Sequence, residues 1–131
     1  MDEVEATCVK SKAIFEKCEG SFIDQISLNV EYEHDRLYIV LRQVPELGEV
    51  SISLARVRNF ELEKGPELGG SFVDSVEAIY LPPLDQPWPL DAEKRVRRFS
   101  GLPSLIWLKI VGPTPIDVIC ESMSVTCEPS Y

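Results

Sequence analysis

Apolar and polar residues alternate along much of the chain with the period of two that is typical of half-buried β-strands. The alternation is clearest over residues 26–32, and it resumes over residues 37–41 after a short charged stretch, which predicts an antiparallel hairpin. A third strand is predicted from Val50 to Leu54. The residues before Glu19 allow either a short strand or a brief helix, because their apolar positions fit both periods.

The alternation slips at two places, and each slip predicts a β-bulge or strand break that bends the sheet. The first slip lies near Arg56, where basic residues take positions that the alternation assigns to the buried face, and the pattern returns at Phe60. The second slip lies near Glu121 or Ser122, where the apolar residues of the last strand change parity.

The second half of the chain predicts three further strands and one long connection. One strand is expected over residues 72–81, and a second hairpin is expected from residues 105–111 and 116–126, which a turn of glycine and prolines separates. Residues 82–104 form a long proline-rich loop excursion, and Trp88 is one of the large apolar residues expected to anchor it.

These elements predict one mainly β domain over residues 1–131. We expect either an antiparallel sandwich or a strongly curled sheet of six or more strands, with little helix. A chain of 131 residues is long enough to bury one hydrophobic core, and its apolar share of 44% is typical of globular proteins.

The chain is acidic, with 22 acids against 13 bases and a formal net charge of -9. This charge disfavours nucleic acid and anionic lipid surfaces as partners. It serves either solubility alone or the attraction of a basic protein partner. There is no signal-peptide pattern, and no apolar run approaches the roughly 20 residues of a membrane-spanning helix, so a soluble cytoplasmic protein is expected.

Few residues suggest catalysis or metal binding. The cysteines Cys8, Cys18, Cys120 and Cys127 lack the spacing of a zinc or redox motif, so we expect reduced thiols, no metal and no cofactor. His34 stands alone in a charged turn, which is a poor position for a catalytic base. We therefore expect a protein that is not an enzyme.

Acidic side chains on predicted outward strand faces are the candidates for binding a basic partner. Trp88 is a candidate as well, either as an exposed aromatic anchor or as a lid that holds the long loop on the core. A basic run over residues 94–98 is expected to neutralise nearby acids. The candidate partner-binding residues are Glu31, Glu33, Asp35, Glu61, Glu63 and Trp88.

Parts of the chain resemble the small β-rich immunity proteins that protect bacteria from their own polymorphic toxins, in particular the family numbered fifty in the immunity series. The resemblance covers about residues 20–126 and is carried by the run 21–24, the run 50–54 and the closing strands 105–112 and 116–125. It implies a bacterial cytoplasmic inhibitor that occupies the active site or substrate groove of a cognate toxin. The alternatives are a non-catalytic adaptor domain and a small-ligand binder.

Overall fold

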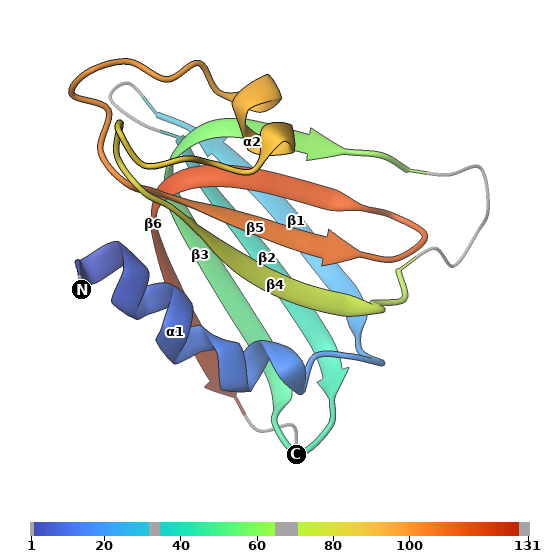
Figure 1. Cartoon of the computed structure of the whole chain (residues 1–131). Helices are drawn as coiled ribbons and strands as arrows, with labels where there is room; N and C mark the ends of the chain where they lie inside the picture. The colour runs from blue at the N-terminus through green and yellow to red at the C-terminus, as the bar shows by residue number, and fades with distance from the viewer. Residues whose placement is uncertain (1, 32–34, 65–70, 129–131) are drawn as a thin grey trace.

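The computed structural model describes residues 2–31, 35–64 and 71–128. Within these residues, two helices and six strands follow one another (Figure 1). In chain order they are α1 (Glu3–Glu16), β1 (Phe22–Val30), β2 (Asp35–Val44), β3 (Gly48–Leu62), β4 (Ser75–Leu81), α2 (Leu90–Arg95), β5 (Leu105–Val111) and β6 (Ile116–Glu128).

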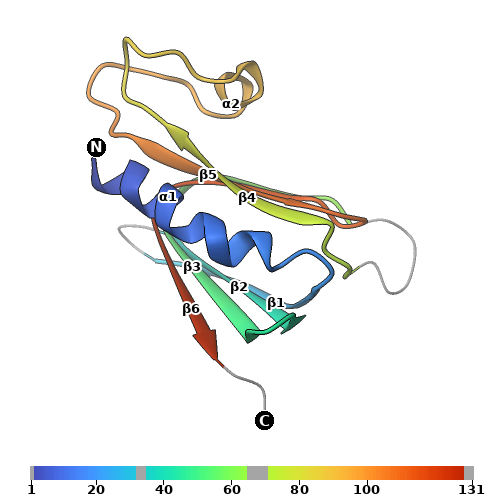
Figure 2. The ribbon, with the colours of Figure 1, turned by 60° about the horizontal axis from the view of Figure 1, so that its bottom comes forward.

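The strands form one six-stranded antiparallel sheet in the order β1-β2-β3-β6-β5-β4. The mainly β class is confirmed, as are the hairpins β1–β2 and β5–β6. The sheet curls strongly without closing, so that two arms diverge from a bend in β3 and β6 (Figure 2). The first arm holds β1, β2 and the paired ends of β3 and β6, and the second arm holds the rest of β3 and β6 with β5 and β4.

The bend lies where the sequence predicts a bulge. Leu54 pairs with Met123, and Val57 pairs with Cys120, and all four side chains belong to or pack against the same core. In a regular strand, residues that face the same side are an even number of positions apart. Leu54 and Val57 are three positions apart, as are Cys120 and Met123, so the alternation of inward and outward residues shifts in both strands at this point. Arg56 has a φ of +56° there, and a register shift follows immediately after Val57. The predicted bend near Arg56 is therefore confirmed.

The N-terminal residues form the helix rather than the strand. The carboxylate of Asp2 accepts a hydrogen bond from the backbone N–H of Glu5 at 2.7 Å, which caps the first turn of α1. Cys8, Ser11 and Phe15 form the buried face of the helix at helical spacing. This face lies in the concave side of the sheet and contacts β4, β5 and β6 (Figure 2).

The outer face of the second arm carries a separate apolar cluster beneath the loop excursion 82–104. Trp107, whose parity differs from that of its neighbours, faces this outer cluster and is 3% exposed. Since the neighbouring residues of β5 face the inner core, β5 is buried on both faces. The cluster consists of Leu81, Trp88, Ala92, Val96, Leu102, Leu105, Trp107 and Ile119.

The segment before β4 ties the second arm to the start of β1. The expected strand 72–81 begins only at Ser75, because Phe72 forms an isolated bridge with Phe22 instead of pairing with β5. The N–H of Gly20 donates to the carbonyl of Val73 at 2.9 Å, and the N–H of Val73 donates to the carbonyl of Ser21 at 2.9 Å. These bonds bring the end of α1 beside the start of β4.

Candidate functional site

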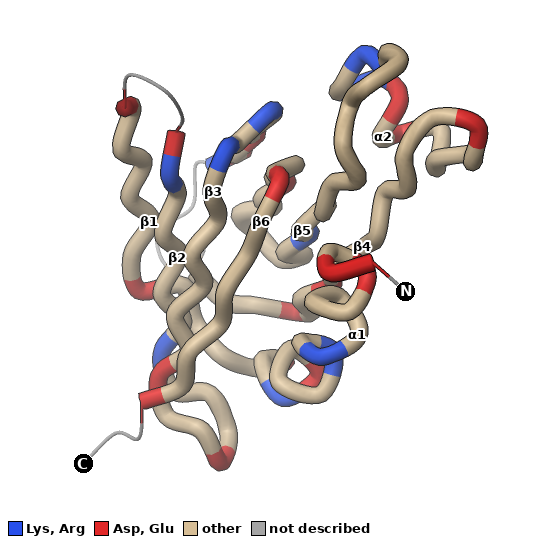
Figure 3. Tube along the Cα trace, turned by 90° about the vertical axis from the view of Figure 1, so that its left-hand side faces the viewer, with Lys and Arg blue, Asp and Glu red and all other residues tan. Residues whose placement is uncertain are grey.

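Two of the acidic residues predicted on the first hairpin, Glu31 and Asp35, lie within the described residues, at the end of the first arm and near basic residues. Glu31 is exposed just after β1, and Asp35 is half-buried at the start of β2. Arg36 follows directly and pairs in register with Ala55 on β3, which precedes Arg56 in sequence. Glu33 and His34 lie outside the described residues. The described part of this hairpin end has mixed charge, with acidic and basic residues near the ends of β1, β2 and β3 (Figure 3).

Glu61 and Glu63 lie beyond the bend, on the second arm. The guanidinium of Arg95 on α2 donates to the carboxylate of Glu61 and also lies 3.6 Å from the carboxylate of Asp117. Glu63 is exposed, and its backbone N–H donates to the carbonyl of Pro115 at 3.2 Å. Arg95 thus neutralises nearby acids, as expected for the basic run, and the two predicted acidic groups do not form one surface.

Trp88 is a lid residue. Its side chain is 6% exposed within the outer cluster, and its Nε1 donates to the carbonyl of Pro82 at 2.6 Å. The guanidinium of Arg98 lies over the ring, with its Cζ 4.4 Å from the ring centroid. The indole therefore fastens the loop excursion to the sheet and is not an exposed anchor for a partner.

The structure brings together an acidic surface that the sequence did not predict, which we call the acidic hollow. It is an open depression of about 540 Å³ between the end of α1, the β2–β3 turn and the segment before β4. It is lined by Glu16, Lys17, Glu19, Gly20, Pro45, Glu46, Phe72 and Asp74.

Carboxylates dominate the acidic hollow. Lys17 forms an ion pair with Glu46 at 3.0 Å, which leaves that pair neutral. The side chains of Glu16, Glu19 and Asp74 have no ion-pair or hydrogen-bond partner among the described residues. Their charges are therefore directed to solvent or to a bound partner.

An aromatic residue stands among these carboxylates. Phe72 is 38% exposed, and its ring packs edge to face against Phe22 with the centroids 5.8 Å apart. Backbone hydrogen bonds connect the residues on either side of Phe22 to the residues on either side of Phe72. Gly20 turns the chain just before them with a φ of +85°, which favours glycine. The hollow thus combines unpaired negative charge with a positioned apolar ring.

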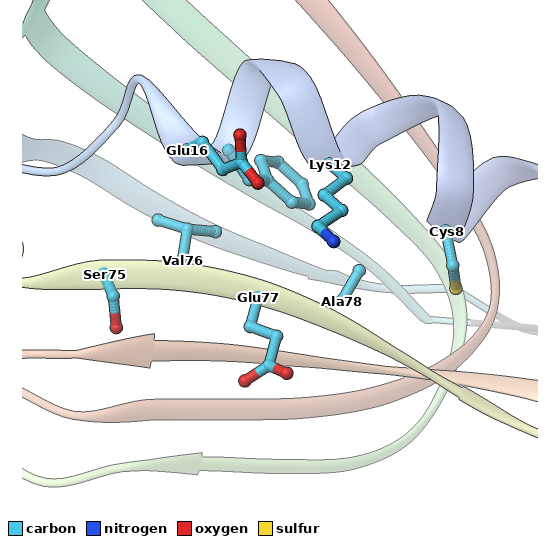
Figure 4. Close-up of a pocket in the computed structure, with 8 residues that line it drawn as sticks. Cys8, Lys12, Glu16, Ser75, Val76, Glu77 and Ala78 are labelled. Atoms are coloured by element: carbon cyan, nitrogen blue, oxygen red, sulfur yellow. The ribbon is translucent and has the colours of Figure 1, made fainter.

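A groove of about 440 Å³ continues from the acidic hollow along α1 and β4 (Figure 4). Glu16 lines both depressions, and Lys12 extends from the helix toward β4. Val76 points to the helix, whereas Glu77 points to the opposite side of β4 (Figure 4). Cys8, a buried thiol, lines the end of the groove away from Glu16.

The thiols in and near these depressions are poor nucleophiles. Burial raises the pKa of Cys8 and of Cys18 to about 11, and it raises the pKa of Cys120 to about 12. All four cysteines are free, and Cys127 is exposed. Residues 2–31, 35–64 and 71–128 hold no group of three or more side chains that could bind a metal ion, and no helix long and apolar enough to cross a membrane.

No local pattern in the sequence predicts the acidic hollow. Glu16 ends α1 and Glu19 follows it, whereas Asp74 precedes β4, and backbone contacts between residues 20–23 and 71–73 bring these segments together. An alternation pattern identifies the faces of one strand and does not show which distant segments meet. Scans against protein-family models, curated proteins and solved structures returned no match for this chain.

Proposed function

We propose that this protein is a non-catalytic inhibitor of the immunity type that binds a basic surface of a bacterial toxin through the acidic hollow. The observation that carries the proposal is the grouping of three carboxylates without described partners around the exposed ring of Phe72. The resemblance of the chain to β-rich immunity proteins supports the class of partner.

The chemistry of the hollow fits a protein surface that carries lysine or arginine. Carboxylates steer a basic partner during diffusion and accept charge-assisted hydrogen bonds from it. An aromatic ring at the centre of such a patch supplies the apolar contact that dominates many binding hot spots. Because Phe72 is held by its bridge to Phe22, little conformational freedom is lost when a partner covers it.

A toxin that acts on nucleic acids or nucleotides presents a basic cleft for phosphate. An inhibitor with a net charge of -9 competes with phosphate for such a cleft, and four acids and one base line the hollow that would meet it. The mixed charge around Arg36 and the ion pair of Glu61 make the two surfaces predicted from sequence weaker candidates.

The test is co-expression with the toxin domain encoded next to this protein. Wild-type protein should restore growth and should bind the purified toxin domain. The double variant Glu16→Lys with Asp74→Lys should lose protection, and its association rate at low salt should fall by about tenfold or more. Far-ultraviolet circular dichroism checks that the variant is folded.

The matched control is Glu63→Lys with Glu128→Lys, which makes the same change in net charge at exposed residues outside the hollow. It should protect cells as the wild type does. If the control pair alone abolishes binding, the partner contacts another surface and the acidic hollow is not the site. If the wild-type protein neither protects cells nor binds the toxin domain, the proposed function is wrong.

A further inference from the structure

Among the residues that the structure describes, the outer edge of β1 is unpaired along most of its length. Segment 71–73 covers only the start of the strand, through the bridge between Phe22 and Phe72 and the hydrogen bond from Ile23 N–H to the carbonyl of Ser71 at 2.7 Å. From Asp24 to Val30, no described residue pairs with the strand on the side away from β2. An open edge presents backbone donors and acceptors that can pair with another strand.

This edge lacks the features that normally keep sheet edges apart. Residues 25–30 contain no charged residue, proline or glycine, and their pairing with β2 is regular after the irregularity at Asp24. Leu28 is 42% exposed and Val30 is 79% exposed, and both lie on the concave face with Ile26. An apolar, uncharged edge of this kind is stable in solution when another strand covers it.

We infer that β1 is an interface with a second copy of this chain, in which two β1 strands pair antiparallel about a two-fold axis at Leu28. A two-fold interface uses the same patch on both subunits, so the patch must complement itself. With Leu28 facing Leu28 of the partner subunit, Ile26 faces Val30 of the partner subunit. Three apolar pairs then line one face of a continuous twelve-stranded sheet, since each copy contributes six strands.

Charge selects this register. With the axis at Leu28, Gln25 faces Glu31 of the partner subunit, so that an amide donor meets a carboxylate. If the axis passed through Ser27 instead, the carboxylate of Asp24 would face Val30 of the partner subunit, and one apolar pair would be lost.

The absence of charge along the strip suits a second copy better than a basic partner. Two molecules with a net charge of -9 repel each other over most of their surfaces. The stretch from Gln25 to Val30 is an uncharged strip along which their backbones can approach, and the neighbouring Asp24 is neutralised by Arg42 at 3.4 Å. A basic partner, in contrast, would find no carboxylate along this strip.

Sedimentation equilibrium of the purified protein tests the interface. The wild type should behave as a dimer at micromolar concentrations, and Leu28→Lys should shift it to a monomer because two ammonium groups would face each other. The control is Leu62→Lys, since Leu62 is 45% exposed at a strand end away from β1 and the dimer should persist. A monomeric wild type, a mixture of larger species, or a dimer that survives Leu28→Lys would overturn the inference.

A cysteine placed on the axis tests the register without charge. In a Cys127→Ser background, Leu28→Cys should form an intermolecular disulfide under mild oxidation, because directly opposite Cβ atoms lie about 4.5 to 5.5 Å apart. Asn29→Cys should form little of this disulfide, since residue 29 of the partner subunit is a diagonal neighbour of residue 29 at about 7 to 8 Å. Equal crosslinking of the two variants, or none in either, would contradict pairing about Leu28.

Discussion

The phenol of Tyr80 on β4 donates a hydrogen bond to the carboxylate of Asp2, the residue that caps α1. The carboxylate therefore joins the start of the helix to the edge strand of the second arm. The hydrogen bond from Tyr80 lowers the pKa of Asp2 below its usual value, and the same bond raises the pKa of Tyr80 to about 12.

The first prediction concerns the pH range over which this bond stabilises the fold. Tyr80→Phe should lower the free energy of unfolding near neutral pH. The Asp2 contribution is lost as the pH falls through the lowered pKa, below about 4. The Tyr80 contribution is complete below about pH 10 and is lost as the pH rises through about 12.

Urea unfolding of the wild type and Tyr80→Phe at acid, neutral and alkaline pH measures this difference, which should be largest near neutral pH. Tyr38→Phe is the control, because Tyr38 is 37% exposed on β2 and its hydroxyl has no partner among the described residues. If the difference in the free energy of unfolding had the same size at every pH, the hydrogen bond would not be the cause of the shifted pKa values of Asp2 and Tyr80.

The second prediction concerns the lid. Trp88→Ala should destabilise the protein by about 3 to 5 kcal/mol, because it leaves a cavity in the outer cluster. Trp88→Phe should cost about 1 kcal/mol, since the carbonyl of Pro82 that loses the indole donor still accepts from Arg98 at 3.3 Å. Under conditions in which the sheet stays folded, trypsin should cleave after Arg97 faster in Trp88→Ala than in the wild type. Unchanged cleavage would contradict the assignment of Trp88 as the lid.

The third prediction concerns the thiols. In the folded protein at neutral pH, Cys127 should react with a maleimide much faster than the other three cysteines, because it is exposed while they are buried with raised pKa values. After unfolding without a reductant, all four should react. Recovery of only two reactive thiols would reveal a disulfide that the structure does not contain.

The fourth prediction concerns the bend. Arg56→Val should destabilise the protein by about 1 to 2 kcal/mol, because a β-branched residue is strained at a φ of +56°. Arg56→Gly should have little effect on the free energy of unfolding, since glycine adopts this conformation freely. Arg58→Val is the control, because it removes only the surface ion pair with Glu121. Equal losses for both valine variants would show that the backbone at Arg56 is not strained.

The sequence predicted the strands well because one face of most of them is buried, which leaves a period of two in the residue order. The bend was predictable for the same reason, since the parity change at Arg56 is local. The helix α1 was ambiguous because its apolar residues also fit a strand, although Asp2 with Glu5 is a capping pair that favours helix.

The candidate site was less predictable than the fold. The parity of Trp107 along its strand allows either a second apolar face or an exposed contact surface, and only the structure shows that the loop excursion covers this residue. The acidic hollow depends on the contact between Gly20 and Val73, which lie in distant parts of the chain. Strand faces are encoded locally, whereas a surface assembled from three separate segments depends on the topology.

The position of β6 in the sheet has a consequence for how the chain folds. Among the described residues, β6 follows the other five strands in sequence, yet it lies between β3 and β5 and joins the two halves of the sheet. During synthesis, β1–β2–β3 and β4–β5 are linked only by the backbone contacts between residues 20–23 and 71–73, and α1 lacks part of its packing surface until β6 emerges. Because the contacts of β6 with β3 and α1 join distant parts of the chain, we expect folding to be slow for a protein of this size. We expect it to be completed in one cooperative step after β6 is made.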